Sequence, residues 1–323
     1  MSTSKNLSNI SSLINDAFSE EEKDDFEPNI VLNVTKNMEE EENNEKLLTI
    51  VPSPLDDRDW VGDSIYHPVT YIPEKLDLRN NLLPIRNQGP YGTCAAQSAA
   101  CMKEWQEKKD INFENYFSPQ FIYNLRENSD SEGMYGRDVM KILNKYGICP
   151  EEKYEYGKLE DKNIIINNED LIKLSVNYKI KNYAKLFSID ATKKALYKNG
   201  PCLICFPVYN NSVNMWIPNF KGQKMQGGHA MTIVGYTKDH FIIRNSWGEK
   251  WGHNGYCYYS FNEWGSHWEI WTTIDDKSHI LDENNEKKNK EEGNNHKENN
   301  KEDNNKKNKK KEKRERTCPF WFW

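Results

Sequence analysis

The chain is most informative at residues 86–98, where it reads Arg86-Asn87-Gln88-Gly89-Pro90-Tyr91-Gly92-Thr93-Cys94-Ala95-Ala96-Gln97-Ser98. A glycine-rich loop ends at Cys94, and residues 94–108 contain no glycine or proline, which predicts a helix that begins at the cysteine. Partial positive charge at a helix N-terminus stabilises a thiolate, so this placement is typical of a nucleophile. For a cysteine considered alone, a buried structural thiol is the alternative.

Two further residues give Cys94 the partners that a nucleophile needs. Gln88 lies six residues before it, so the Gln88 side-chain amide and the Cys94 backbone N–H can point at one oxyanion. Far downstream, His229 stands at the head of an apolar strand and follows two glycines that let a substrate come close. Taken alone, a histidine such as His229 is more often a hydrogen-bonded structural residue.

Asn245 follows sixteen residues after His229. The runs 230–236 and 241–244 predict a hairpin that returns Asn245 beside His229. An asparagine oxygen there accepts a hydrogen bond from one ring nitrogen and leaves the other facing the thiol. Trp247 is then placed to shield this hydrogen bond from water.

Together these stretches resemble the papain family of cysteine peptidases, which includes the cathepsins. The matching motifs are Asn-Gln-Gly-x-x-Gly-x-Cys at 87–94, Gly-His-Ala at 228–230 and Asn-Ser-Trp-Gly-x-x-Trp-Gly-x-x-Gly-Tyr at 245–256. Residues 72–79 resemble the start of a mature papain-type enzyme, and residues 117–121 resemble the helix after the nucleophile. The resemblance covers about residues 72–274, with the motifs in the expected order.

The resemblance implies a role for each matched residue. It assigns Cys94 as nucleophile, His229 as general base and acid, Asn245 as the orienting residue and Gln88 as an oxyanion donor. A substrate-binding wall is expected from Gly133, Met134, Tyr135, Gly136, Gly228 and Trp247.

The chain also departs from the family pattern. Ala95 replaces the tryptophan that usually follows the nucleophile, and Tyr91 replaces a cysteine that is normally disulfide-bonded. With these losses the chain resembles the branch found in bacteria and large DNA viruses more than the secreted lysosomal members.

The distribution of elements predicts an α+β fold. Helix signals dominate up to about residue 156, and strand signals dominate afterwards, at residues 202–208, 230–236, 241–244 and 256–260. Helices segregated from antiparallel strands favour two lobes with an active-site cleft between them. The resemblance implies the papain-like version, with a helical left lobe and an antiparallel β-barrel-like right lobe.

Charge divides the chain into three parts. Residues 1–71 carry 5 basic and 16 acidic side chains, a formal charge of −11, whereas residues 277–323 carry 14 and 10, a charge of +4. We expect an acidic arm at 1–55, largely disordered or propeptide-like. A peptidase domain is expected at 56–276, with a mature-like start near 72. The tail at 277–323 is rich in Asn, Lys and Glu and is expected to be disordered.

Cysteine usage indicates a reducing environment. Seven cysteines at irregular spacings, with no apolar signal stretch and no transmembrane run, predict an intracellular protein, or a virion protein if the source is a virus. Cys202 and Cys205 lie three apart in a predicted strand and so face opposite sides, which favours two core thiols over a metal site. We expect no metal and no cofactor.

These observations predict a cysteine endopeptidase that acts on protein or peptide substrates and not on nucleic acid. Endopeptidase action is expected because no histidine pair of the cathepsin B exopeptidase type precedes the strand half. The first alternative is a catalytically silent papain-like module that acts as a structural or docking protein. The second is the same dyad acting on an isopeptide bond or in a transferase reaction.

The two arms carry further expectations. The apolar strip at 47–51 is suited to lie along the active site as an extended strand and restrain the enzyme; a passive targeting arm is the alternative. The tail ends in a basic run at 306–316 and an aromatic cluster at 317–323, which suits an anionic membrane surface or a protein partner. A solvated tail is the alternative.

Overall fold

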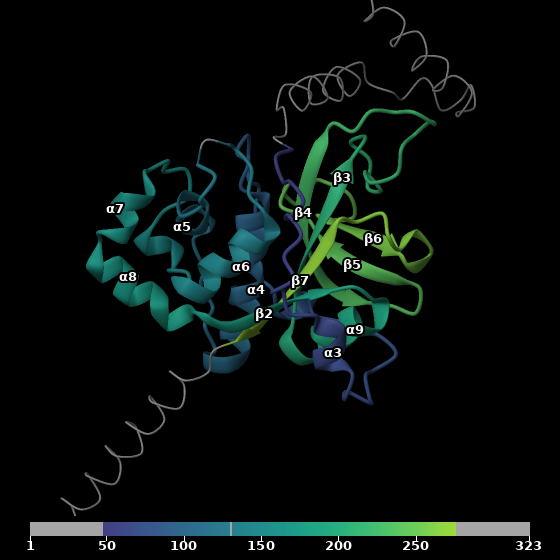
Figure 1. Ribbon diagram of the computed structural model, residues 1–323, viewed down its shortest axis with the longest axis horizontal. Coiled ribbons are helices and arrows are strands. Elements are labelled where there is room, and N and C mark those ends of the chain that lie inside the picture. Colours follow the sequence, from purple (N-terminus) through teal and green to yellow (C-terminus); the bar gives the residue numbers. More distant parts are fainter. Residues whose placement is uncertain (1–47, 130, 276–323) are drawn as a thin grey trace, which may run out of the picture. The chain divides into compact units, whose positions relative to one another are not determined.

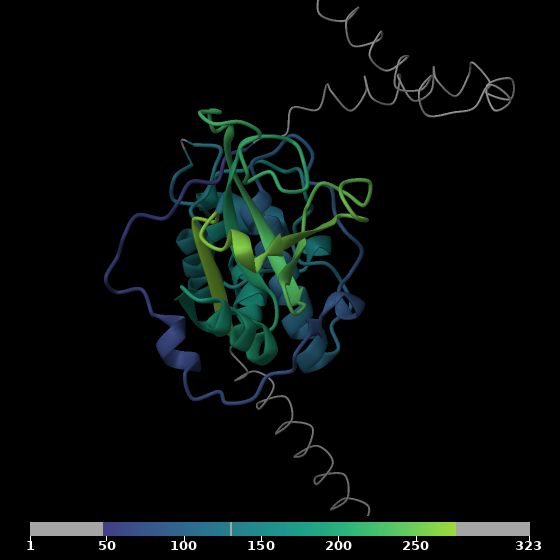
Figure 2. The same ribbon diagram turned by 90° about the vertical axis from the view of Figure 1, so that its right-hand side faces the viewer.

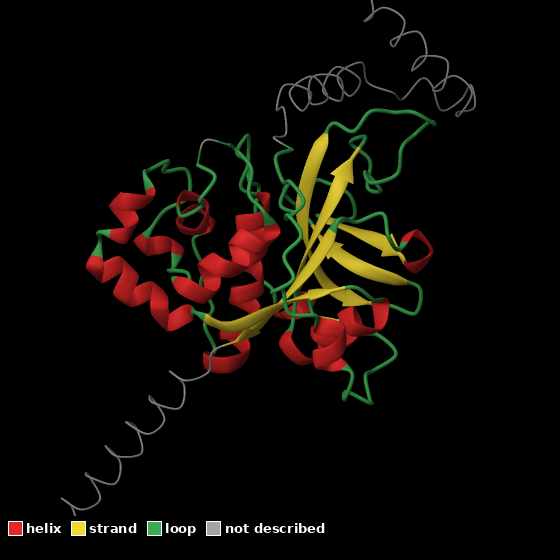
Figure 3. Cartoon of the chain, in the orientation of Figure 1, coloured by secondary structure: helices red, strands yellow, loops and turns green. Residues whose placement is uncertain are grey.

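The computed structural model of the protein describes residues 48–129 and 131–275. An amphipathic spacing at residues 7–18, the acidic runs of the arm and the predicted tail at 277–323 lie outside these ranges. Most of the helices gather on one side and most of the strands on the other, with some helices beside the strands (Figure 3), which is the α+β arrangement expected from the sequence.

The helices lie mainly in the first part of the described chain. They are α3 (Gly62–Tyr66), α4 (Cys94–Ile111), α5 (Pro119–Asn124), α6 (Gly136–Lys145), α7 (Lys162–Ile166), α8 (Glu169–Ser175) and α9 (Ile189–Asn199). Short 3-10 turns lie at Arg79–Asn81, Glu151–Lys153, Val176–Tyr178 and Phe261–Glu263. The central helix is α4, which begins at the predicted nucleophile and buries almost its whole length.

The strands form one antiparallel sheet. They are β1 (Leu76–Asp77), β2 (Ile180–Leu186), β3 (Cys202–Val208), β4 (Gly227–Tyr236), β5 (His240–Arg244), β6 (Tyr256–Ser260) and β7 (Glu269–Asp275). The order across the sheet is β2-β7-β3-β4-β5-β6, with β1 pairing to β4. Figure 1 shows β4 and β3 on the side of the sheet that faces α4.

Two apolar clusters pack around this sheet. One joins α4, α5 and α6 to Leu203, Cys205 and Trp271, and the other fills the inside of the strand lobe around Phe206, Trp216 and Tyr259. Cys202 belongs to the second cluster and Cys205 to the first, so these two thiols face opposite sides of β3 as predicted. The six cysteines of the described residues are unpaired thiols, and all are buried.

Several predicted elements have the expected bounds, whereas the predicted division into helices and strands holds only approximately. The predicted strands at 202–208 and 256–260 have the bounds of β3 and β6, and Ser118 caps α5 by accepting a hydrogen bond from the Phe121 N–H. The division near residue 156 is only approximate, because α7, α8 and α9 follow it. None of the helices in the described ranges is long and apolar enough to cross a bilayer.

Candidate active site

Cys94 is the first residue of α4, the helix of 18 residues at the centre of the molecule. Its side chain is 1% exposed, and the backbone N–H groups of Ala230, Ala95 and Cys94 itself lie at the sulfur. Ala230 follows His229 in β4, so the thiol of the helical lobe lies beside the start of the β4 strand. The helix N-terminus and these donors all favour a negative sulfur.

His229 is held by Asn245 from the neighbouring strand. The His229 Nε2 and Asn245 Oδ1 atoms are 2.7 Å apart, and both side chains are buried. The strands β4 and β5 pair antiparallel, with Ile233 opposite Ile243, so the end of β5 returns to the start of β4. This is the hairpin that the sequence predicted. The indole of Trp247 stacks on the imidazole, with ring centroids 4.3 Å apart.

The hydrogen bonds around Asn245 define the tautomer of His229. Asn245 Oδ1 also accepts a hydrogen bond from the Ser246 backbone N–H at 2.7 Å, so the atom that faces the imidazole is the oxygen. An oxygen accepts, and therefore His229 Nε2 must carry the proton. In neutral imidazole the other nitrogen, Nδ1, is then the acceptor that a general base needs.

Gln88 lies on the loop before α4 and is 1% exposed. Its Oε1 accepts a hydrogen bond from the Ser246 hydroxyl at 2.6 Å, and its Nε2 donates to the Tyr91 carbonyl at 2.8 Å. The backbone N–H of Gln88 donates to the Ser246 carbonyl at 2.8 Å. Ser246 therefore fixes the orientation of the amide, with its N–H donors on the side of the nucleophile loop.

Tyr156 is a site residue that sequence reasoning missed. Its hydroxyl donates to the Gln88 carbonyl at 2.8 Å and lies 2.6 Å from the Thr93 hydroxyl, and its ring meets Tyr91 edge to face. Tyr91 stands where the family has a disulfide-bonded cysteine, so an aromatic contact and two hydrogen bonds tie this loop to the helical lobe. Nothing local in the sequence at 154–156 signals this role.

An extended segment, Leu48–Ser53, lies directly across these residues; we call it the strap. Thr49 forms a parallel bridge with Gly228 on the strand side, and Val51 forms one with Tyr135 on the helical side. The Ile50 N–H donates to the Gly228 carbonyl at 3.2 Å, and the Val51 N–H donates to the Met134 carbonyl at 3.4 Å. In Figure 1 the purple trace of the strap runs between the helical and strand parts.

The far end of the strap is fastened by a polar cluster. The Ser53 hydroxyl donates to Glu269 Oε1 at 2.9 Å and accepts a hydrogen bond from the Arg137 N–H at 3.0 Å. Glu269 is 2% exposed, and its other oxygen lies 3.5 Å from Lys185 Nζ. A buried carboxylate with a hydroxyl partner gives this contact more strength than a surface hydrogen bond.

Glycines form the wall that the strap touches. A Cβ on Gly133 would lie 1.7 Å from the Thr49 carbonyl oxygen, and one on Gly228 would lie 2.3 Å from the Ile50 carbonyl oxygen. Any side chain at these two positions would therefore push an extended chain away from the surface. A Cβ on Gly136 would lie 2.6 Å from Glu269 Oε1, so this glycine leaves room for the Glu269 carboxylate.

With the strap in place, burial of Cys94 favours the protonated thiol over the thiolate. Burial raises its pKa to about 11, although the N–H groups of Ala230, Ala95, Cys94 and Ile50 act in the opposite direction. A buried anion loses its hydration, which is why desolvation outweighs these donors. The described structure is thus an occluded state of the site.

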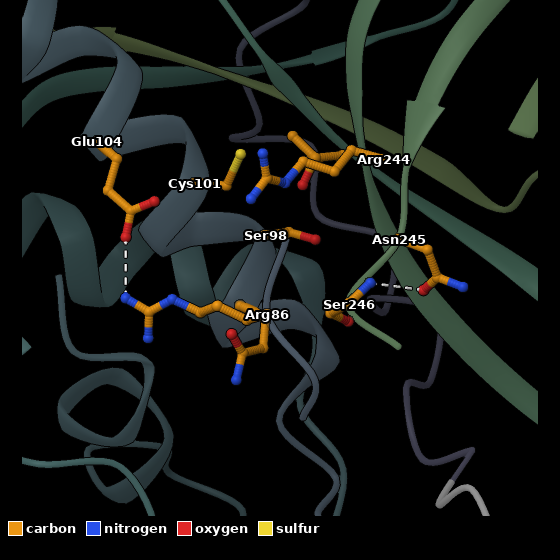
Figure 4. Close-up of a pocket in the computed structure, with 9 residues that line it drawn as sticks. Arg86, Ser98, Cys101, Glu104, Arg244, Asn245 and Ser246 are labelled. Atoms are coloured by element: carbon orange, nitrogen blue, oxygen red, sulfur yellow. Dashed lines mark hydrogen bonds and ion pairs between the residues drawn. The ribbon is translucent and has the colours of Figure 1, made fainter. Parts of the chain in front are cut away.

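A small enclosed space lies behind Asn245 and Ser246 (Figure 4). It has a volume of about 20 Å³, enough for roughly one water molecule. Glu104 lines it and pairs with Arg86 at 3.1 Å; burial raises the pKa of this carboxyl, and Arg86 counteracts the effect. Arg244 donates to the Leu83 and Pro84 carbonyls at 2.7 Å each, so this side chain of β5 holds the loop that leads to Gln88.

Residues 72–268 match the family model for the papain family of cysteine proteases. The chain belongs to the papain family. The match covers every predicted catalytic residue, and the strap lies ahead of its first residue.

Members of the papain family from several sources resemble the chain. A peptidase C1-like protein of Acanthamoeba polyphaga mimivirus is 33% identical over 194 residues, which cover 53% of this chain and 62% of the viral protein. Cathepsin K of Mus musculus is 29% identical over 235 residues, covering 67% of this chain and 68% of that protein. The chain thus spans less than two thirds of the viral relative.

A solved structure of the family shares the fold. Xylellain, a cysteine protease from Xylella fastidiosa, matches with a TM-score of 0.61 and 27% identity, covering 72% of this chain and 97% of xylellain. The resemblance to viral and bacterial members inferred from the sequence is therefore confirmed.

The structure brings the predicted site residues together in two groups. The first is Gln88, Cys94, His229 and Asn245, which are linked as follows: Ala230, next to His229, lies at the Cys94 sulfur, His229 bonds Asn245, and Ser246, next to Asn245, bonds Gln88. The second, against the strap, is Gly133, Met134, Tyr135 and Gly228, with Gly136 beside Glu269. Trp247 differs from the rest of the predicted wall because it covers the ring of His229. Ser53, Tyr156, Ser246 and Glu269 were not predicted.

Proposed function

We propose that this chain is a cysteine endopeptidase that hydrolyses peptide bonds through an acyl-enzyme on Cys94. The observation that carries the proposal is the hydrogen bond from His229 Nε2 to Asn245 Oδ1, made beside a cysteine at the N-terminus of α4. It leaves Nδ1 to take the thiol proton. No part of this arrangement requires a metal or a cofactor.

In this mechanism each residue acts at a stated atom. The Cys94 sulfur attacks the carbonyl carbon of the substrate, and the carbonyl oxygen becomes an oxyanion near Gln88 Nε2 and the Cys94 N–H. His229 then gives its proton to the leaving amine, which breaks the peptide bond. Water, deprotonated by His229, cleaves the thioester and returns the free thiol.

We further infer that the strap holds the enzyme inactive. The strap presents the Ile50 N–H to the sulfur rather than a carbonyl carbon, so the bound segment is not positioned for attack. The oxyanion donor Gln88 Nε2 is meanwhile bonded to the Tyr91 carbonyl. Because the strap belongs to the same chain, its effective concentration is high and weak contacts suffice to exclude substrate.

Labelling with an epoxide-type thiol-protease inhibitor tests the nucleophile. A chain that begins at Asp56 lacks the strap, and we expect the inhibitor to add one equivalent, mapped to the peptide that contains Cys94. The Cys94→Ala variant should take up none, whereas Cys101→Ala, which changes another buried thiol of α4, should label normally. If folded protein takes up no label at Cys94, the silent-module alternative is favoured.

Comparison of two chains tests the strap. Protein that begins at Met1 should label at Cys94 more slowly than protein that begins at Asp56, because the sulfur must wait for the strap to leave. Equal rates would mean that the strap does not restrain the site, and the arm would then be a targeting segment.

A further inference from the structure

The chain between the strap and the body of the enzyme is unusually exposed. This loop, Pro54–Arg58, contains Leu55, which is 97% exposed, and Arg58, whose side chain is 87% exposed. Arg58 turns back onto Asp56, with Nε to Oδ1 at 2.8 Å and Nη2 to Oδ2 at 2.7 Å, so these contacts are local to the loop. In Figure 2 the purple trace before α3 swings away from the body.

The chain that follows the loop is built into the folded domain. Arg137 Nε donates to Asp59 Oδ1 at 2.8 Å, and the Lys185 N–H donates to the Trp60 carbonyl at 2.9 Å. Val61 pairs with Lys185 in a parallel bridge, which extends the sheet edge at β2. The segment is therefore anchored as soon as the loop ends.

The next turn, α3, contributes to the core. Tyr66 is 5% exposed and packs with Leu186, Ala195 and Leu196. Gly62 fits so closely that a Cβ there would lie 2.4 Å from Leu186 Cδ2. Removing residues 59–71 would expose this apolar surface, which disfavours a stable enzyme that begins near residue 72.

The location of a cut decides whether the strap can leave. A cut near residue 72 would leave the strap joined to the anchored segment at 59–66 and hence at high effective concentration. A cut between Ser53 and Asp59 separates the strap from every one of those anchors. Exposed loop tips of this kind are also the preferred sites of proteolysis.

We propose that Pro54–Arg58 is the processing site of this chain, and that residues 59–71 stay with the processed enzyme. Another peptidase molecule makes the cut, because the thiol of the same chain is covered. One peptide bond is hydrolysed: water supplies the hydroxyl of a new carboxyl group at the end of the strap segment and the proton of a new amino terminus. The benefit of the cut rests on the proposed function, but the location of the site does not.

Limited digestion with subtilisin tests the location. The probe is the full chain carrying Cys94→Ala, which cannot process itself, and cuts between residues 48 and 275 are mapped by intact mass. We expect the first cut within 54–58, on the order of tenfold faster than any cut at 67–72. The reason is that the side-chain contacts described for 54–58 are local to that loop, whereas Val69 in the second segment packs against the core of the strand lobe. The fragment that follows should keep its thermal unfolding temperature.

Two variants sharpen the test. Gly62→Ala in the same background should detach α3 and open new cuts within 60–71, whereas Ser64→Ala, an exposed change in the same turn, should not. A first cut at 67–72, or accumulation of a folded fragment that begins near residue 72, would overturn the proposal. Neither outcome depends on whether Cys94 is catalytic.

Discussion

In the proposed mechanism, Asn245 acts only through the ring of His229. Its oxygen accepts from Nε2 and from the Ser246 N–H, so it sets the tautomer and the orientation of the imidazole but carries no proton in the reaction. In the same mechanism, His229 is both the base that activates the thiol and the acid that protonates the leaving amine. Asn245 thus orients the imidazole, whereas His229 transfers protons.

We expect His229→Ala to reduce kcat/KM for a peptide substrate by on the order of a thousandfold or more, and Asn245→Ala by on the order of a hundredfold. The second loss is smaller because a residual fraction of correctly oriented imidazole remains. Steady-state hydrolysis by chains that begin at Asp56 measures both. Equal losses would contradict this division of roles.

Tyr156 positions the loop that carries the oxyanion donor. Tyr156→Phe removes the hydroxyl that bonds the Gln88 carbonyl and Thr93, and peptide hydrolysis should fall about tenfold because the loop around Gln88 loses these two of its hydrogen bonds. Alkylation of Cys94 by iodoacetamide displaces iodide and forms no oxyanion, so labelling of the same variant with this reagent should keep its rate.

Tyr116→Phe is the matched control, because its hydroxyl bonds the Pro84 carbonyl away from the nucleophile. A parallel fall of hydrolysis and labelling in Tyr156→Phe would indicate a general structural role rather than positioning.

At the scale of elements, Ser53 is where the strap gains its buried polar contact. Ser53→Ala removes the hydroxyl between Glu269 and the Arg137 N–H and leaves the buried carboxylate with one partner fewer. The loss of about 1–3 kcal/mol should let the strap open more often, so full-chain protein labels at Cys94 roughly tenfold faster. Leu55→Ala, at an exposed position, should leave the rate unchanged.

The central helix α4 contains a buried ion pair. Lys103 Nζ lies 2.6 Å from Glu107 Oε1 one turn along α4, and both side chains are 0% exposed. Lys103→Met alone should lower the free energy of unfolding by about 3–5 kcal/mol, because it removes a positive charge that lies beside a buried carboxylate. The double change Lys103→Met with Glu107→Leu should recover most of that loss, as measured by urea unfolding. A double variant less stable than the single one would contradict this account.

At the scale of the molecule, the sequence predicted single elements better than the pairing of distant strands in the sheet. Local patterns gave the helix that begins at Cys94 and the bounds of β3 and β6, because capping and alternation act over a few residues. They missed β2 and β7, which pair with each other although almost a hundred residues separate them. Tyr156 was missed for the same reason, since its hydroxyl bonds residues 63 and 68 positions away.

The burial of individual side chains was also harder to predict than the motifs. His267 lies in the loop after β6, where a polar side chain is expected at the surface, but it is half-buried. Its Nδ1 lies 2.9 Å from the Tyr259 hydroxyl, and its ring meets Trp264. Packing between aromatic residues of β6 and the following loop is a tertiary effect that no local spacing reveals.

This burial makes the stability of the whole domain depend on pH. Desolvation, aided by the charge of Lys185, lowers the pKa of His267 to about 4, whereas an unfolded histidine titrates near pH 6.5. Between these values the unfolded chain binds a proton that the folded chain does not, so this residue lowers the free energy of unfolding as the pH falls from about 6.5 to about 4. Above pH 6.5 it does not make the free energy of unfolding depend on pH.

His267→Gln should therefore flatten the decline in thermal unfolding temperature between pH 6.5 and 4.5, whereas His253→Gln, at an exposed position, should follow the unmodified chain. If His267→Gln loses stability over this range as steeply as the unmodified chain, the acid sensitivity arises from other groups.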